Sequence, residues 1–196
     1  MKTATPAQEA PPGLPRGLAQ LVAEAGQQAE ARPVERWDPP WCGDIDMRIA
    51  ADGSWHYRGS PIGREALVRL FASILRREPD GRHVLVTPVE KVGIAVDDAP
   101  FLAVELFSEG EGRGQRLTFR TNVGDIVAAG PEHPLRFALE TATGGLKPYI
   151  NVRGGLEALA TRAVALELVE IASEQEGASG VWSGGVFFAF PGPSLG

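Results

Sequence analysis

Four side chains that suit a phosphate-bearing ligand occupy alternate positions of one short stretch, GLKPYINVR. They are Lys147, Tyr149, Asn151 and Arg153. Because side chains alternate between the two faces of a β-strand, a strand here would present all four on one face. Cations neutralise phosphate, an aromatic ring stacks on a base, and an amide bonds to base edges. The spacing predicts a ligand-binding face, and the alternative is the solvated outer face of a sheet.

Other polar residues extend this candidate site. Arg120 and Asn122 alternate in the same way in FRTN, on a neighbouring predicted strand. Glu90 and Lys91 stand at the start of another strand, in TPVEKV. Arg64 lies where a glycine-containing turn meets a predicted helix, and backbone N–H groups and a guanidinium can bind an anion together there. The alternative for each arginine is a surface pair with a nearby glutamate. The sequence has neither a Walker loop nor a G-x-G-x-x-G fingerprint.

The residue types that most often carry catalysis are scattered. His56, His83 and His133 have no ligand-type residue three or four positions further along the chain, as a helical zinc motif requires. Cys42 is the only cysteine, which excludes an internal disulfide and a cysteine-cluster zinc site. Cys42 would become a nucleophile only if the fold brought a histidine to it, and a small buried thiol is the alternative.

Two acidic pairs suggest a divalent metal, because hard cations bind converging carboxylates. Asp44 and Asp46 fall on one face of a predicted strand, however, and Asp97 and Asp98 precede Pro100 in a turn, so local structure accounts for both pairs. We therefore expect no catalytic residue, no metal ligand and no cofactor. The candidate ligand-binding residues are Arg64, Glu90, Lys91, Arg120, Asn122, Lys147, Tyr149, Asn151 and Arg153.

The elements that would position these residues follow from apolar periodicity. A short amphipathic helix is predicted from Leu14, and a hairpin with a turn at Asp52-Gly53 covers 44–59. Ser60-Pro61 has the form of an N-cap followed by the first residue of a helix. Further strands are predicted in HVLVTPV, KVGIAV, FLAVELF, QRLTFRT, GDIVAAG, PLRFALE, YINVR and VWSGGVFFAF, and a third helix from Leu156 to about Ala172.

Two stretches of the chain resemble each other, WHYRGSPIGREALVRLF at 55–71 and YINVRGGLEALATRAV at 149–164. Each is expected to form an aromatic strand ending in Arg-Gly, a turn, and a helix that opens with Glu-Ala-Leu, so that 54–76 and 148–172 would superpose. Chance is the alternative in a chain rich in Arg, Ala, Leu and Gly. The shared order of strands, helix and strands favours an internal duplication of α+β type.

Composition limits the function classes. The chain has 196 residues, 43% hydrophobic and 22% charged, as in an ordinary globular protein. A net charge of −6 argues against a general nucleic-acid-coating protein but permits a local basic cleft. No signal-peptide core and no run near the roughly 18 apolar residues of a membrane span is present. These features and the single cysteine predict a cytoplasmic protein without a membrane partner, and they leave its oligomeric state open.

Several longer motifs resemble a known family. WCGDIDMRIAADGSWHYRGSPIGR, LVTPVEKVGIAVDDAPF, TNVGDIV, PYINVRGGLEAL and GVWSGG are together similar to the bacterial family called domain of unknown function 1285, from about Pro33 to Phe190. The resemblance implies a duplicated α+β core whose C-terminal half is superficially like a pleckstrin-homology barrel. It also implies a nucleotide-like or nucleic-acid-derived ligand between the halves and a signalling role. It supplies no catalytic residues.

We therefore expect an α+β protein of two related strand–helix–strand motifs that form small antiparallel sheets or partial barrels. The expected divisions are a tail and short helix at 1–32, a first motif at 33–108 and a second at 109–196. The predicted function is non-enzymatic binding of a nucleotide-like molecule or short nucleic acid where the halves meet, in a regulatory protein. The alternatives are an enzyme with an unrecognised pocket and a protein-interaction scaffold.

Overall fold

The chain forms two compact units in a computed structural model that describes residues 10–24 and 32–192. The first unit extends to Asp97 without the turn 51–53, and the second contains that turn and the chain from Asp98 onward. The second unit thus begins earlier than the boundary at 108/109 that the sequence pattern indicates, because the strand at 101–109 pairs with later strands.

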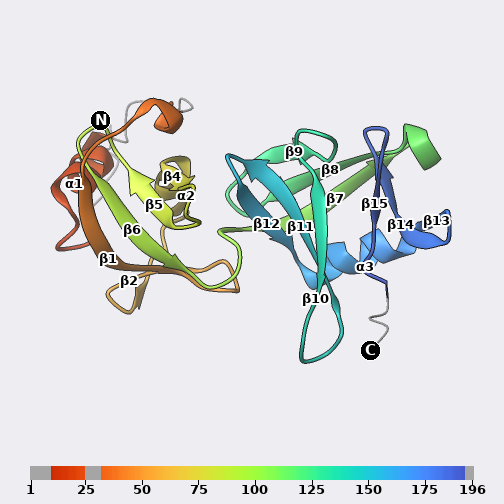
Figure 1. Ribbon diagram of the computed structural model, residues 1–196. Coiled ribbons are helices and arrows are strands. Elements are labelled where there is room, and N and C mark those ends of the chain that lie inside the picture. Colours follow the sequence, from red (N-terminus) through yellow and green to blue (C-terminus); the bar gives the residue numbers. More distant parts are fainter. Residues whose placement is uncertain (1–9, 25–31, 193–196) are drawn as a thin grey trace, which may run out of the picture. The chain divides into compact units, whose positions relative to one another are not determined.

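The first unit builds one six-stranded sheet in the order β3-β2-β1-β6-β5-β4 (Figure 1). Its elements are α1 (Arg16–Glu24), η1 (Val34–Arg36), β1 (Trp41–Ile49), β2 (Trp55–Tyr57), β3 (Ser60–Pro61), α2 (Glu65–Ser73), β4 (Leu75–Arg77), β5 (His83–Val86) and β6 (Lys91–Val96). Helix α2 packs through Phe71, whose ring centroid lies 6.2 Å from that of Trp55. Helix α1 buries Leu18, Leu21 and Val22 on one face, as the apolar spacing predicts.

The second unit builds a six-stranded sheet in the order β10-β11-β12-β7-β8-β9 and a small three-stranded sheet. Its elements are β7 (Phe101–Glu109), η2 (Gly112–Gly114), β8 (Arg116–Thr121), β9 (Ile126–Ala128), β10 (Leu135–Leu139), β11 (Leu146–Arg153), β12 (Leu156–Ala160), α3 (Arg162–Glu170), β13 (Ser173–Gln175), β14 (Ala178–Ser183) and β15 (Val186–Ala189). The Ser183 hydroxyl joins the two sheets, because it accepts from Leu117 N at 2.9 Å and donates to Ala129 O at 2.8 Å.

The two large sheets have the same strand order. Read from its other edge, the second sheet runs β9-β8-β7-β12-β11-β10, which repeats the first sheet with every strand number raised by six. Each sheet joins two antiparallel three-stranded meanders by a parallel pair, β1 with β6 and β12 with β7. The expectation of antiparallel sheets is therefore wrong. The sheets are mixed, because the first and last strand of each set lie side by side, and local patterns carry no information about such distant pairing.

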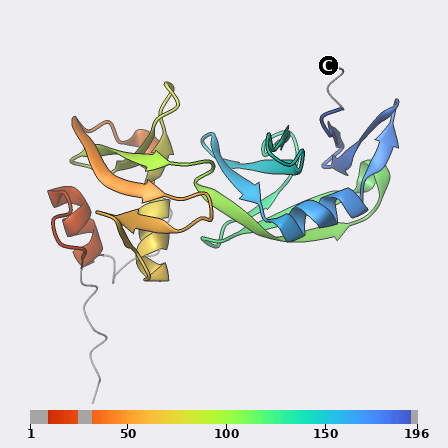
Figure 2. The same ribbon diagram turned by 90° about the horizontal axis from the view of Figure 1, so that it is seen from below.

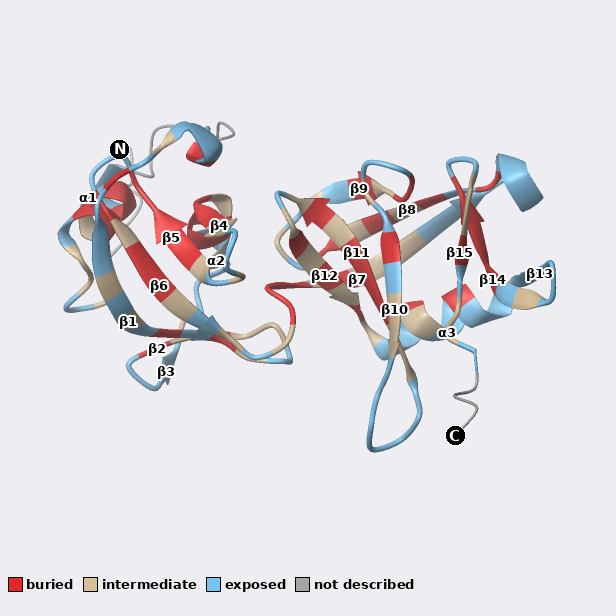
Figure 3. Cartoon of the chain, in the orientation of Figure 1, coloured by how far each residue is buried: buried red, intermediate tan, exposed pale blue. Residues whose placement is uncertain are grey.

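Helix α3 lies along β7 and β12 on one face of the second sheet (Figure 2). It buries Val164 and Leu168 completely against that face, while Leu166 and Val169 stay about half exposed. Buried residues concentrate on the central strands of both sheets, whereas β13 and the outer side of α3 are exposed (Figure 3). In the described segments, no helix has both the length and the apolar character that a membrane crossing requires.

The helix predicted from Leu156 is wrong over its first residues. Leu156, Ala158 and Ala160 are buried and the residues between them are not, which is the two-residue period of strand β12. Helix α3 begins only at Arg162, after Thr161, whose side chain accepts from Val164 N as an N-cap. The five residues 156–160 are apolar or helix-favouring, so their pattern alone fits a helix as well as a strand.

The helix start predicted at Ser60-Pro61 is also wrong. Arg58 and Gly59 both have positive φ, 50° and 75°, and form a two-residue hairpin turn that makes Ser60–Pro61 the strand β3. Helix α2 ends at Ser73, and Leu75–Arg77 pairs with β5 as strand β4.

The resemblance between 55–71 and 149–164 has a local structural basis that differs from the expected one. Gly154 and Gly155 have φ of 51° and 77°, nearly those of Arg58 and Gly59, so both stretches form a strand, a tight turn, a strand and then a helix. The turn aligns Arg58 with Gly154 rather than with Arg153. The two hairpins do not correspond in the matching strand orders, because one joins the second and third strands of the first set of six and the other joins the fifth and sixth strands of the second set.

Candidate functional site

Lys147 and Tyr149 converge on one carboxylate in the second unit. Lys147 Nζ forms an ion pair with Asp98 Oδ2, and the Tyr149 hydroxyl donates to Asp98 Oδ1 at 2.8 Å. The hydrogen bond to Asp98 raises the pKa of Lys147, and burial followed by the hydrogen bond to Asp98 raises the pKa of Tyr149. The cation that the sequence predicts for phosphate therefore already has an anionic partner.

The ring of Tyr149 is covered as well. Arg136, its cross-strand neighbour on β10, places its guanidinium carbon 4.0 Å from the Tyr149 ring centroid. Two hydrogen bonds, of 3.0 and 2.8 Å, hold that guanidinium on the Glu157 carboxylate. Since Tyr149 is only 6% exposed, its ring offers no free face on which a base could stack.

Asp98 is expected to control the ionisation of Tyr149. Replacing Asp98 with asparagine removes the negative charge that disfavours tyrosinate, so the raised pKa of Tyr149 should fall toward that of free tyrosine. The measurement is an alkaline titration of tyrosinate absorbance, in which a Tyr149→Phe variant identifies the signal of Tyr149 against that of Tyr57. An unchanged or higher pKa of Tyr149 in the Asp98→Asn protein would contradict the assigned hydrogen bond.

Asn151 and Arg153 do not continue the row in the expected way. The pairing of β11 with β12 shifts register between Asn151 and Arg153, as at a β-bulge, and this breaks the alternation of faces. Arg153 Nη1 bonds to Asp125 at 2.7 Å, and its guanidinium carbon lies 5.0 Å from the centroid of the buried Phe101 ring. The main-chain oxygen of Asn151 is hydrogen-bonded to His133 Nδ1 at 3.0 Å.

Arg120 lies on β8 and Asn122 in the turn after it, and the prediction that they neighbour the strand of Lys147 and Tyr149 is wrong, because β12 and β7 separate β8 from β11. Arg120 forms a two-point ion pair with its cross-strand partner Glu105, with Nε at 2.7 Å from Oε2. The side-chain oxygen of Asn122 accepts from Leu102 N at 3.0 Å. Both contacts stabilise the pairing of β7 and β8.

Glu90 anchors helix α1 in the first unit. Its carboxylate, 9% exposed, accepts from Leu18 N at 2.9 Å near the start of the helix. A Cβ atom on Gly17 would lie 2.8 Å from Glu90 Oε1 and 2.7 Å from Thr87 Oγ1, so a residue with a side chain would overlap both. This is an anion at a helix N-terminus, an arrangement that stabilises the fold.

Lys91 belongs to a second anchoring cluster of the first unit. Lys91 Nζ lies 3.5 Å from Glu78 Oε2, and Arg76 bonds twice to Glu78 Oε1, at 2.8 and 2.6 Å. Arg76 Nη1 also donates to the main-chain oxygens of Val34 and Trp37, at 2.9 and 2.7 Å. Burial acts to raise the pKa of Glu78, but the hydrogen bond and charge of Arg76 and the charge of Lys91 outweigh burial and lower it.

Arg64 differs from these residues because it lines an open cavity of about 540 Å³ in the first unit. Arg58 lines the same cavity, with Pro11, Pro12 and Leu67 among the other lining residues. Within residues 10–24 and 32–192, neither arginine forms an ion pair with a carboxylate. None of the described residues that line the cavity is acidic.

Tyr57 and Gly13 hold Arg58 in place. The Arg58 guanidinium carbon lies 5.5 Å from the Tyr57 ring centroid, and the Tyr57 hydroxyl donates to Gly13 O at 2.6 Å. A Cβ atom on Gly13 would lie 2.6 Å from Arg58 Nη1, so the glycine permits this close approach. The proline-rich segment before α1 thus forms one wall of the cavity and fixes a guanidinium beside it.

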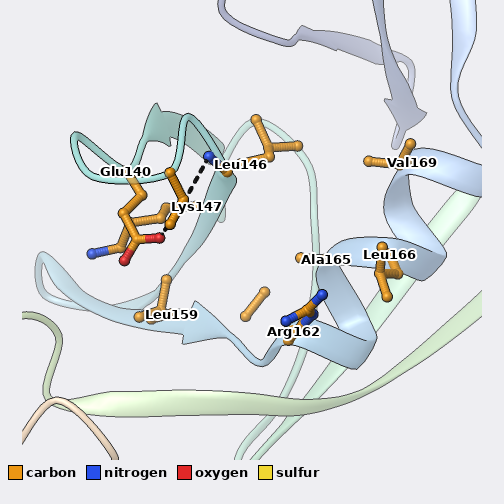
Figure 4. Close-up of a pocket in the computed structure, with 11 residues that line it drawn as sticks. Glu140, Leu146, Lys147, Leu159, Arg162, Ala165, Leu166 and Val169 are labelled. Atoms are coloured by element: carbon orange, nitrogen blue, oxygen red, sulfur yellow. Dashed lines mark hydrogen bonds between the residues drawn. The ribbon is translucent and has the colours of Figure 1, made fainter.

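A second cavity, of about 620 Å³, lies in the second unit (Figure 4). The loop after β10 supplies Glu140 and strand β11 supplies Lys147 on one side, and α3 supplies Arg162, Leu166 and Val169 on the other. The side chain of Arg162 has no hydrogen bond or ion pair with any residue that the structure describes. Sequence analysis missed Arg58 and Arg162. Arg162 has no acidic residue three or four positions away, and that local signal could have identified it.

Neither of these two cavities is lined by a described histidine or by Cys42. His133 lines a third cavity, together with Arg113, Arg116 and Glu132. The described residues contain no cluster of three or more His, Cys, Asp or Glu side chains suited to a metal ion. Cys42 is exposed rather than buried. Asp97, one of the acidic pair next to Pro100, binds Arg48 through two hydrogen bonds of 2.7 and 2.5 Å.

Comparison with known proteins gives a consistent family assignment. Residues 32–99 match the N-terminal domain of the family described as domain of unknown function DUF1285, and residues 100–190 match its C-terminal domain. No curated protein matches the chain.

Two solved structures are similar to this chain. The crystal structure of a DUF1285 family protein from Silicibacter pomeroyi has 53% sequence identity and a TM-score of 0.80, over 87% of this chain and 93% of that one. That of a DUF1285 family protein from Shewanella baltica has 29% identity and a TM-score of 0.50, over 64% of this chain and 91% of that one. The chain therefore belongs to the DUF1285 family and contains its N-terminal and C-terminal domains in tandem.

Proposed function

We propose that this protein is a ligand-binding regulatory protein whose first unit holds the phosphate of a nucleotide-like small molecule between Arg58 and Arg64. One observation carries the proposal: two guanidinium groups line a single cavity of about 540 Å³ without an acidic residue among the described lining residues. Paired guanidinium forks match the charge and the geometry of a phosphate group.

The charge balance of the chain supports this assignment. In the described segments, nine lysines and arginines form ion pairs with carboxylates. In a protein of net charge −6, where carboxylates outnumber cations, an arginine that stays unpaired in a cavity is available to an outside anion. The positive end of helix α2, which begins at Glu65, adds to the attraction.

The walls of the cavity suit the rest of such a ligand. Pro11, Pro12, Ile62 and Leu67 supply apolar surface, and the hydroxyl of Ser60 supplies a hydrogen-bonding group. The volume falls within the range of about 300 to 1,000 Å³ that small-molecule sites occupy. A planar base packed between proline and leucine side chains, with its phosphate on the two arginines, would use both kinds of wall.

The row on β11 is a weaker candidate for the same ligand. Carboxylates already hold Lys147 and Arg153, and Arg136 covers the ring of Tyr149. A phosphate would have to displace these partners, at a cost in free energy that the cavity of the first unit avoids. The third cavity, of about 770 Å³, contains Arg113 and Arg116 but also the carboxylate of Glu132.

A second inference concerns the origin of the two six-stranded sheets. We infer an internal duplication in which β1 to β6 correspond to β7 to β12, because the strand orders match one for one. Under this correspondence α2 has no counterpart in the second sheet and α3 none in the first. The likeness of the C-terminal half to a pleckstrin-homology barrel stays a prediction.

Calorimetric titration with nucleotides and with the matching unphosphorylated nucleosides tests the proposal. Nucleotides should bind the parent protein and nucleosides should bind at least about tenfold more weakly, because they lack the charge-assisted contacts. Arg64→Ala should weaken nucleotide binding about tenfold. Arg69→Ala, an exposed arginine of the same helix that is paired with Glu65, is the matched control and should bind as the parent does. Absence of nucleotide binding to the parent would refute the proposal.

A further inference from the structure

The cavity of the second unit has an apolar wall that the fold itself leaves uncovered. Helix α3 turns Val164 and Leu168 into the core, yet Leu166 and Val169 are 55% and 50% exposed and line the cavity. Leu146 of strand β11 and Leu159 of strand β12 also line it. Large apolar side chains that face water in a concave site are typical of a surface that another molecule covers.

The charges that line this cavity leave one cation uncompensated. Lys147 is paired with Asp98, and Glu140 accepts a hydrogen bond from the Thr143 hydroxyl. The guanidinium of Arg162 forms no ion pair or hydrogen bond with the residues that the structure describes. Figure 4 shows Arg162 at the start of α3, across the cavity from Glu140 and Lys147. A ligand with one negative charge can therefore pair with Arg162. A second negative charge on the ligand would be repelled by the carboxylate of Glu140 if it lay near the loop after β10.

We propose that this cavity binds a small amphipathic monoanion, with a carboxylate or sulfonate on Arg162 and an apolar body against Leu146, Leu159, Leu166 and Val169. The volume of about 620 Å³ accommodates a two-ring compound or a medium-length acyl chain. The ligand class differs from the phosphate-bearing one assigned to the first unit. This inference does not rest on that proposal, and either can fail alone.

An anionic fluorophore tests this site in the full-length protein. The probe is 8-anilinonaphthalene-1-sulfonate, which carries a naphthalene ring system, a phenyl ring and one sulfonate, and fluoresces when its rings leave water. Titration should give a saturable signal with one probe per chain. Arg162→Ala should weaken binding about tenfold, because one charge-assisted contact is lost. Leu166→Asp should weaken it further, because it adds a negative charge and removes apolar contact.

Two controls make the result decisive. Arg116→Ala removes an exposed arginine of the same unit that does not line this cavity, and it should bind the probe as the parent does. Decanoate should displace the probe, and decanol, of equal chain length but no charge, should need at least about tenfold more. Unaltered melting curves show that the variants are folded. Equal binding to the parent and Arg162→Ala proteins, equal displacement by decanol, or no saturable signal would overturn the proposal.

Discussion

Replacing Arg76 with alanine is expected to lower the free energy of unfolding by about 2 to 4 kcal/mol. Arg76, on β4, is only 12% exposed, and it joins the carboxylate of Glu78, the residue after this strand, to the main-chain oxygens of Val34 and Trp37. Alanine leaves that carboxylate, itself 17% exposed, with only the Lys91 ammonium, 3.5 Å away, as a cationic partner among the described residues. It also removes the guanidinium donor from both carbonyl groups, of which Val34 O keeps the bond from Trp37 N at 3.2 Å.

Urea denaturation of the parent and variant proteins measures this difference. Arg76→Lys should recover only part of the loss, because an ammonium group keeps the charge but cannot reach Glu78 and both carbonyls with the fork of a guanidinium. Arg69→Ala breaks an exposed pair with Glu65 and should change stability far less. If Arg76→Ala were as stable as Arg69→Ala, the cluster would not anchor the segment before β1.

Removing both cavity arginines of the first unit is expected to reduce nucleotide affinity about 100-fold. Each charge-assisted contact should contribute a binding free energy near the lower end of the usual range for such contacts, because Arg58 and Arg64 are exposed to water. Both arginine side chains are exposed, so their removal leaves the core intact and the double variant Arg58→Ala/Arg64→Ala should fold as the parent does. Calorimetric titration of this variant beside the two single variants measures the loss.

Salt dependence gives an independent measure of the same contacts. The affinity of the parent for a nucleotide should fall as salt concentration rises, because ions screen the attraction between phosphate and guanidinium. The affinity of the double variant should depend on salt much less. Equal salt dependence in the two proteins would mean that other cations hold the phosphate.

Local patterns in the sequence identified most strands, because alternation and turn residues act over a few positions. The hairpin of β1 and β2 with its Asp52-Gly53 turn is an example. The order of the strands within the sheets was beyond such patterns. The parallel pairing of β1 with β6, and of β7 with β12, joins strands far apart in the chain, and their hydrogen bonds leave no periodic trace.

Two helix starts were predicted wrongly, because the backbone conformation of one residue and the packing of one strand decide the structure there. The strand β3 at Ser60–Pro61 exists because Arg58 adopts positive φ, which a residue other than glycine rarely does, so the sequence favours a helix cap there. In the second unit, Glu157-Ala158-Leu159 repeats the residues that open α2, but the alternating burial of β12 decides its structure. Tertiary packing outweighed helix propensity at this point.

The candidate site shows the same division. The alternation of residue types correctly predicted that Lys147 and Tyr149 lie on one strand, two positions apart. It could not predict that both bind the carboxylate of Asp98, which is distant in the chain. Arg64 was found from its place between a turn and a helix. Its companion Arg58 was hidden, because its position in the cavity depends on Tyr57 and on the segment around Gly13.

The most direct test of the phosphate site is a two-dimensional amide NMR titration of the full-length protein with a nucleotide. At 20.8 kDa the chain is well suited to this method. The account predicts that the largest shifts occur at residues 58–67 and around Gly13, and that Arg58→Ala/Arg64→Ala abolishes them. Largest shifts at residues 147–153, or no shifts at saturating nucleotide, would contradict it.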